Sequence, residues 1–211
     1  MRTIPNISEQ LIPLEVKIAI VFIPALVGRS VSQPERQILA LPVRYGGMGI
    51  INPTKISQRE YHCSRKITEP LVSLICQQDQ DIRKVSQEVV QKIKEGLKKD
   101  KEEHFRETFN LLYFSANQRL KNHLMQAREK GASTWLTALP LKSLNYTLNK
   151  QEFQDSINLR YGWQIPGMPV YCGCGMKNSV YHNLDCKKGG YVSMRHNAIR
   201  DTVAYFLREA R

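Results

Sequence analysis

The chain has 211 residues, of which 42% are hydrophobic and 24% charged, a composition typical of a folded protein and unlike that of a disordered tail. Its formal net charge is +12, from 31 lysines and arginines against 19 aspartates and glutamates. This excess favours an anionic partner, either nucleic acid or an acidic membrane surface, over a merely soluble basic protein.

One stretch of the chain is strongly apolar. Ile18–Val27 is about half as long as the roughly 20 residues that a membrane-spanning helix needs. It contains Pro24 and follows the charged residues Glu15 and Lys17. The order of charged, apolar and small residues also differs from that of a secretory signal. The sequence therefore predicts no membrane span and no membrane partner.

Prolines recur through the first 81 residues, and three glycines lie close together there. Only short helices are expected here, because prolines interrupt the chain at Pro5, Pro13, Pro24, Pro34, Pro42 and Pro53. Gly46, Gly47 and Gly49 lie close together and demand a turn with unusual backbone dihedrals. A dinucleotide-binding loop would need a further glycine where Asn52 stands, so the block predicts a packing turn instead.

Helical periodicity follows this region. Val85, Val89, Ile93 and Leu97 recur every four residues, and residues 152–163 predict a short amphipathic helix. The expected fold class is therefore mainly α-helical, with little sheet.

Three segments organise the chain. Residues 1–81 are expected to form short helices and residues 82–171 a helical linker region. Residues 172–211 are expected to form a small zinc module that ends in a helix.

Four residues near the C-terminus have the chemistry of a metal site. Cys172, Cys174, His182 and Cys186 follow the pattern C-x-C-x7-H-x3-C. Three thiolates and one imidazole suit a closed, structural zinc site with no position for a catalytic water. The alternative is a set of small buried cysteines beside a surface histidine. Five unevenly placed cysteines do not resemble a disulfide framework, which favours a reducing, intracellular compartment.

Cationic and polar side chains follow this cluster. They are Lys187, Lys188, Arg195, His196 and Arg200. We expect the last three near the start of a helix capped by Ser193, where cations and helix N–H groups together bind phosphate. For His196, metal ligation and a structural hydrogen bond are the alternatives.

Several sequence blocks, taken in this order, resemble one family. They are LPVRYGGMGIINP (41–53), ITEPLVSLI (67–75), GASTWLTALPL (131–141), EFQDSINLRYGW (152–163), and the cysteine–histidine cluster followed by GG and RHNAIRD. From about Leu41 onward, the chain resembles the region downstream of the polymerase palm in reverse transcriptases of non-LTR retrotransposons. The resemblance implies a helical thumb or connector for the glycine block and a CCHC zinc knuckle for the cluster, within a longer polyprotein.

The motifs that would carry catalysis are missing from this sequence. It has no Tyr-x-Asp-Asp motif to hold polymerase metals, and no HExxH or Ser/His/Asp arrangement. We therefore expect a non-catalytic, nuclear portion of such a polyprotein that binds DNA or RNA, with basic helices over 82–130 following the phosphate backbone. The alternative is a zinc-stapled helical module that binds another protein through its amphipathic C-terminal helix.

Overall fold

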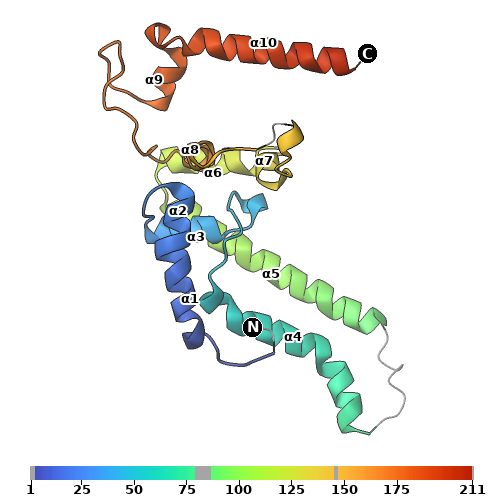
Figure 1. Cartoon of the computed structure of the whole chain (residues 1–211). Helices are drawn as coiled ribbons and strands as arrows, with labels where there is room; N and C mark the ends of the chain where they lie inside the picture. The colour runs from blue at the N-terminus through green and yellow to red at the C-terminus, as the bar shows by residue number, and fades with distance from the viewer. Residues whose placement is uncertain (1–2, 79–86, 145–146, 211) are drawn as a thin grey trace. The chain divides into compact units, whose positions relative to one another are not determined.

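The computed structural model describes residues 3–78, 87–144 and 147–210 (Figure 1). Over these ranges the chain is mainly helical, which confirms the expected fold class. The described residues contain no strand beyond one isolated bridge between Tyr171 and Lys177.

The chain divides into two compact units, Met1–Gln164 and Ile165–Arg211. The helices of the first unit are η1 (Glu9–Leu11), α1 (Ile12–Lys17), η2 (Ile18–Phe22), α2 (Ile23–Val27), α3 (Gln33–Ala40), η3 (Val43–Tyr45), α4 (Pro53–Cys76), α5 (Gln87–Ser115), α6 (Gln118–Arg128), α7 (Thr134–Thr137), η5 (Lys142–Leu144) and α8 (Lys150–Arg160). Those of the second are α9 (Val180–Asp185), η6 (Lys187–Gly189) and α10 (Tyr191–Glu209).

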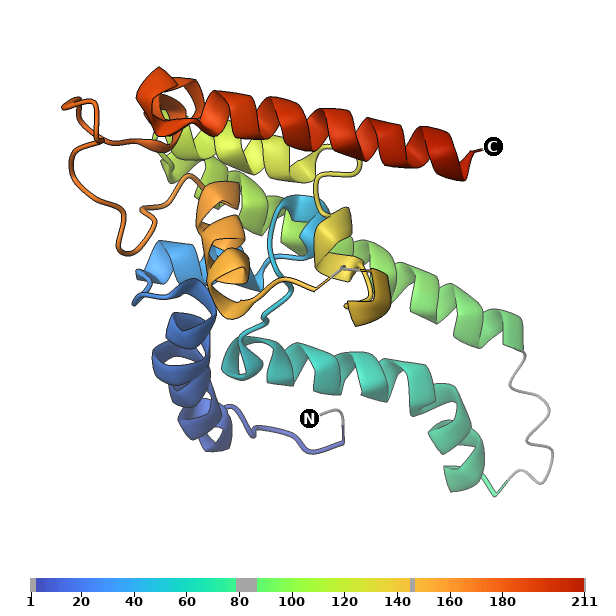
Figure 2. The same ribbon diagram turned by 45° about the horizontal axis from the view of Figure 1, so that its top comes forward.

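The two units differ from the three segments suggested by the sequence. The expected boundary at 81/82, like Val85 of the periodic pattern, lies outside the described residues. On either side of it, α4 and α5 pack against each other, and Lys101 Nζ of α5 lies 3.1 Å from Glu60 Oε1 of α4. Both views of the ribbon show these two long helices side by side (Figures 1 and 2).

One hydrophobic core joins the N-terminal helices to those after residue 87. Ile23 of α2, Leu39 of α3, Phe109 of α5, Leu124 of α6 and Ile157 of α8 are all buried in one cluster. This burial explains why residues far apart in the sequence form a single unit, since burying large apolar side chains is the main favourable contribution to folding.

Polar contacts fix the last helix of this unit against the first ones. Asn158 of α8 is fully buried, and its Nδ2 donates to the carbonyl oxygen of Val27 at 2.8 Å.

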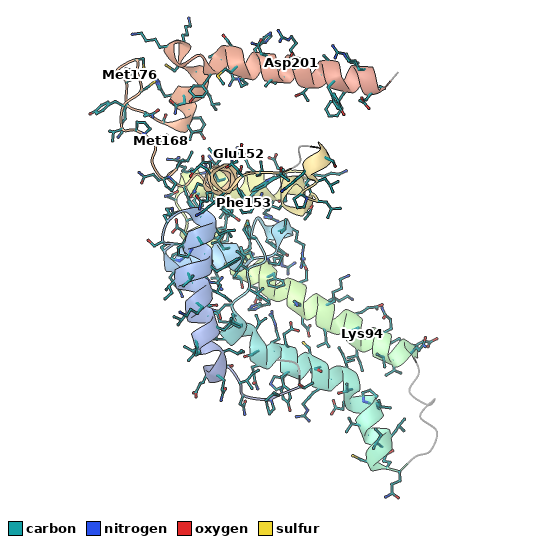
Figure 3. All side chains as sticks on the ribbon, in the orientation of Figure 1. Lys94, Glu152, Phe153, Met168, Met176 and Asp201 are labelled. Carbon is teal, nitrogen blue, oxygen red and sulfur yellow. The ribbon has the colours of Figure 1, made fainter. Side chains whose placement is uncertain are left out.

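The helix α8 begins with a capping box, in which Asn149 Oδ1 accepts from Glu152 N–H at 2.9 Å and Glu152 Oε2 accepts from Asn149 N–H at 2.7 Å. Figure 3 labels Glu152 and the neighbouring Phe153 on α8.

The N-terminal helical segment is longer than the apolar stretch of the sequence indicates. Helical backbone runs over Glu9–Val27, 19 residues with a mean hydropathy of 1.9 in its most apolar window. The segment is therefore long and apolar enough to cross a membrane, a criterion that core helices and N-terminal signal sequences also meet. Pro24 does not end it, because it stands in the first turn of α2, directly after the π-helical turn η2.

A nearly buried ion pair ties this segment to α3. Arg36 Nε and Nη2 each donate to the carboxylate of Glu15 at 2.9 Å, and Arg36 Nη1 donates to the carbonyl oxygen of Ile50 at 2.6 Å. The side chains of Arg36 and Glu15 are only 5% and 15% exposed. This bidentate geometry compensates both charges for their loss of water.

The glycine block forms the packing turn that its sequence predicts. Gly46 and Gly49 have φ values of +82° and +70°, which L-residues rarely adopt. Gly47 has no room for a side chain, because a Cβ there would stand 1.9 Å from the carbonyl oxygen of Leu41. The buried hydroxyl of Tyr161 donates to the carbonyl oxygen of Gly46 at 2.9 Å and so connects this turn to the end of α8.

We expect the first unit to lose stability in alkali through Tyr161. Burial raises the pKa of its hydroxyl from an ordinary value near 10 to about 12. In the unfolded chain this hydroxyl ionises first, so its contribution is complete below about pH 10 and is lost as the pH rises toward 12. Urea unfolding followed by tryptophan fluorescence should show this decline in the parent and a smaller one in Tyr161→Phe. Equal alkaline declines in both proteins would contradict the assignment.

Candidate metal centre

A short hairpin positions the first two cysteines. The Tyr171–Lys177 bridge closes it, and the N–H of Cys172 donates to the carbonyl oxygen of Met176 at 2.9 Å. Gly175, with a φ of +87°, allows its own N–H to donate back to the carbonyl oxygen of Cys172 at 2.8 Å. The chain therefore turns tightly enough for two cysteines separated by one residue to face the same point. Figure 3 labels Met176 in the segment before α9.

The short helix α9 presents the other two ligands. Ser179 caps it, its Oγ accepting from the N–H of His182 at 3.0 Å. Cys186 is the C-cap residue, and its N–H donates to the carbonyl oxygen of His182 at 2.8 Å. His182 and Cys186 thus stand one helical turn apart, as their spacing predicts. The cap at Ser179 was not predicted, although a serine three residues before a ligand on a helix is a recognisable N-cap pattern.

The four ligand atoms converge. The Sγ atoms of Cys172 and Cys186 lie 3.6 Å apart, and Sγ of Cys174 lies 3.1 Å from Nε2 of His182. All four atoms lie within 4.8 Å of one another. Tetrahedral coordination, with metal–sulfur distances of about 2.3 Å and metal–nitrogen distances of about 2.0 Å, separates ligands by roughly 3.5–3.8 Å. The predicted residues come together, and the group can hold one metal ion.

The protonation of Cys172 reflects this crowding. A backbone hydrogen bond from Cys174 lowers the pKa of the Cys172 thiol, but desolvation and hydrogen bonds with the thiols of Cys186 and Cys174 raise it by more. A cation among these sulfurs favours the thiolates, so metal binding at this group is expected to release protons.

The second unit has almost no hydrophobic core apart from this cluster. Among its described residues, only Cys186 has a buried side chain. Units of this size usually need disulfides, metals or association with another chain to fold. None of the five cysteines forms a disulfide, so no disulfide cross-links this unit.

The cationic residues predicted to contact nucleic acid all lie on the exposed surface of the second unit. Lys187 and Lys188 belong to η6, whereas Arg195, His196 and Arg200 belong to α10. None of these five residues belongs to the group whose ligand atoms converge.

The start of α10 differs from the prediction. The cap residue is Gly190, with a φ of +68°, and Ser193 lies inside the first turn. Arg195 and His196 therefore stand beyond the first turn, and only Lys187 and Lys188 lie just before the helix start. Arg200 is engaged by its neighbour, since its Nη2 lies 2.8 Å from Asp201 Oδ1; Figure 3 labels Asp201 on α10.

Comparison with known proteins assigns no family. No protein-family model, no curated protein and no solved structure matches this chain.

Proposed function

We propose that this chain is a non-catalytic, nucleic-acid-binding portion of a retroelement reverse transcriptase polyprotein of the non-LTR type. The rest of that polyprotein and DNA or RNA would be its partners, in the nucleus. The observation that carries the proposal is the convergence of four metal-ligand atoms within 4.8 Å, directly followed by exposed cations. The order of the sequence blocks from Leu41 onward supports the retroelement origin.

Zinc is the metal that we propose for the Cys3His group. Three thiolates with one imidazole are a typical donor set for structural zinc. When bound, zinc cross-links the hairpin of Cys172 and Cys174 to α9, which carries His182 and precedes Cys186. The four ligands fill a tetrahedral shell, so the role proposed for the ion is structural.

Nucleic-acid contact is proposed for the lysines next to this centre. Lys187 and Lys188 are exposed and directly follow the buried ligand Cys186. A metal-fixed backbone would hold both ammonium groups at one end of the long helix α10. Ammonium and guanidinium groups bind the phosphate backbone without reading its sequence, so we propose no sequence preference.

Binding to nucleic acid should weaken steeply with salt. For a 20-base-pair duplex followed by fluorescence anisotropy, the logarithm of the association constant should fall linearly with the logarithm of the salt concentration. Lys187→Gln with Lys188→Gln should reduce that slope by about 1–2, because each lost phosphate contact contributes roughly 0.9.

The matched control removes two exposed lysines elsewhere, Lys142 and Lys150. This control should leave the slope within error of the parent. Salt-independent or absent binding of both DNA and RNA by the parent chain would contradict the proposed function.

The second candidate is a protein-interaction module, favoured by an exposed apolar stripe on α10. Val192, Ile199, Val203 and Phe206 share one helix face and are 38–62% exposed. Such a stripe fits the helix-in-groove mode of recognition. Partner binding that survives neutralisation of Lys187, Lys188 and Arg195 would favour this candidate.

A further inference from the structure

A cavity of about 290 Å³ lies inside the first unit, between α3, α4 and α5. Cations, amides and apolar side chains line it, and among the described residues no aspartate or glutamate does. The cavity shares no residue with the metal centre. Its volume lies near the lower end of the range for small-ligand pockets.

The positive charge of this cavity is only partly neutralised. Arg36 is matched by Glu15, as its two 2.9 Å hydrogen bonds show. Lys55 and Arg59 stand one turn apart on α4, and neither forms an ion pair within the described ranges. The Arg59 guanidinium carbon lies 5.6 Å from the ring centroid of Phe105 on α5, which orders the arginine over that ring.

The pKa of His104, on the α5 wall of the same cavity, reflects the same positive charge. Its pKa is lowered first by burial and then by the charge of Arg59, while Glu107, outside the lining, acts in the opposite direction. A concave site with unmatched cations concentrates anions, because low-dielectric walls strengthen the attraction.

The other residues that line the cavity can contact a flat, partly apolar ligand. Leu41 and Ile56 provide apolar walls beside the Phe105 ring. Gln33 and Gln37 bring side-chain amides, which can donate to and accept from the edge of a base. Neither amide has a hydrogen-bond partner within the part of the chain that the structure describes.

We propose that this cavity binds a mononucleotide, either free or as the 5′-phosphorylated end of a strand. Its phosphate would pair with Lys55 and Arg59, and its base would lie against the apolar walls beside Gln33 and Gln37. This site is independent of the proposed function, because it uses neither the metal centre nor the cations that follow it.

The test is calorimetric titration of the full chain with adenosine 5′-monophosphate. Lys55→Gln with Arg59→Gln should weaken binding about tenfold or more, because charge-assisted contacts to phosphate are lost. The matched control, Arg65→Gln with Lys66→Gln, removes the same two charge types from the same helix outside the cavity lining. It should change the affinity less than about twofold. Arg59→Lys, which keeps the charge, should recover part of the loss, and thermal melting of each variant checks its fold.

Four further compounds test which chemical groups the cavity recognises. Adenosine and inorganic phosphate alone should each bind at least about tenfold more weakly than the nucleotide, and equal binding of either would overturn the proposal. Competition by a 5′-phosphorylated oligonucleotide, but not by its unphosphorylated form, identifies a strand end as the source; no competition identifies the free nucleotide. Absence of nucleotide binding by the parent, or equal losses in both double variants, would also overturn it.

Discussion

Replacing Cys174 and Cys186 with serine should abolish metal binding and unfold the second unit while leaving the first unit intact. The expected effect is large, because a structural zinc ion in a small module contributes on the order of 10 kcal/mol to folding at neutral pH. Apart from Cys186, which this variant replaces, no described residue of Ile165–Arg211 is buried, so no hydrophobic core offsets the loss. Hydrogen exchange across the chain measures both units at once, and amides of α9 and the hairpin should lose protection in the variant.

The chain supplies its own matched control for this experiment. Cys63 and Cys76 are also free thiols, but both lie on α4 in the first unit. Cys63→Ser with Cys76→Ser should keep the metal and the protection of α9. Trp135 and Trp163 both belong to the first unit, so tryptophan fluorescence should give the same melting curve for the parent and for the Cys174/Cys186 variant. Unchanged protection of α9 in that variant would contradict a metal-dependent fold.

Gly47→Ala should strongly destabilise the first unit. The added Cβ would stand 1.9 Å from the carbonyl oxygen of Leu41 and 2.6 Å from its Cβ, and a backbone oxygen cannot move aside without breaking the turn. We expect a loss of about 3 kcal/mol or more in the free energy of unfolding, at the upper end for a single substitution. Urea unfolding followed by tryptophan fluorescence measures it.

Gly96→Ala is the control for this substitution. Gly96 lies in the interior of α5, and a Cβ there meets nothing within 4 Å. Alanine should stabilise the helix by about 0.5–1 kcal/mol, because glycine loses more backbone freedom on folding. Equal stability of Gly47→Ala and the parent would mean that the turn at the glycine block is not closed as described.

The convergence of the four candidate metal ligands could be predicted from the sequence alone. The identity and spacing of the four ligands predicted their convergence, since residues four apart share a helix face and a glycine beside Cys174 permits a tight turn. The start of α10 was predicted wrongly at Ser193. Gly190, which adopts a left-handed conformation, ended the preceding turn and let the helix begin three residues earlier.

The expectation of only short helices in residues 1–81 is wrong at α4, which runs over 24 residues and contains Pro70 in its interior. Pro13 and Pro24 suggested breaks, yet both stand in the first turn of a helix, where the missing N–H costs little. The segment Glu9–Val27 is therefore longer than its apolar stretch indicated. The cavity lined by Lys55 and Arg59 had no sequence signal, because its walls come from three helices that only the tertiary fold brings together.

Native mass spectrometry of the purified full chain measures its zinc content, on which the proposed metal centre depends. We expect about one zinc ion per chain, lost in the Cys174/Cys186 variant and retained in the Cys63/Cys76 variant. A folded parent chain that contains no zinc, and takes up none when it is supplied, would contradict a structural zinc centre.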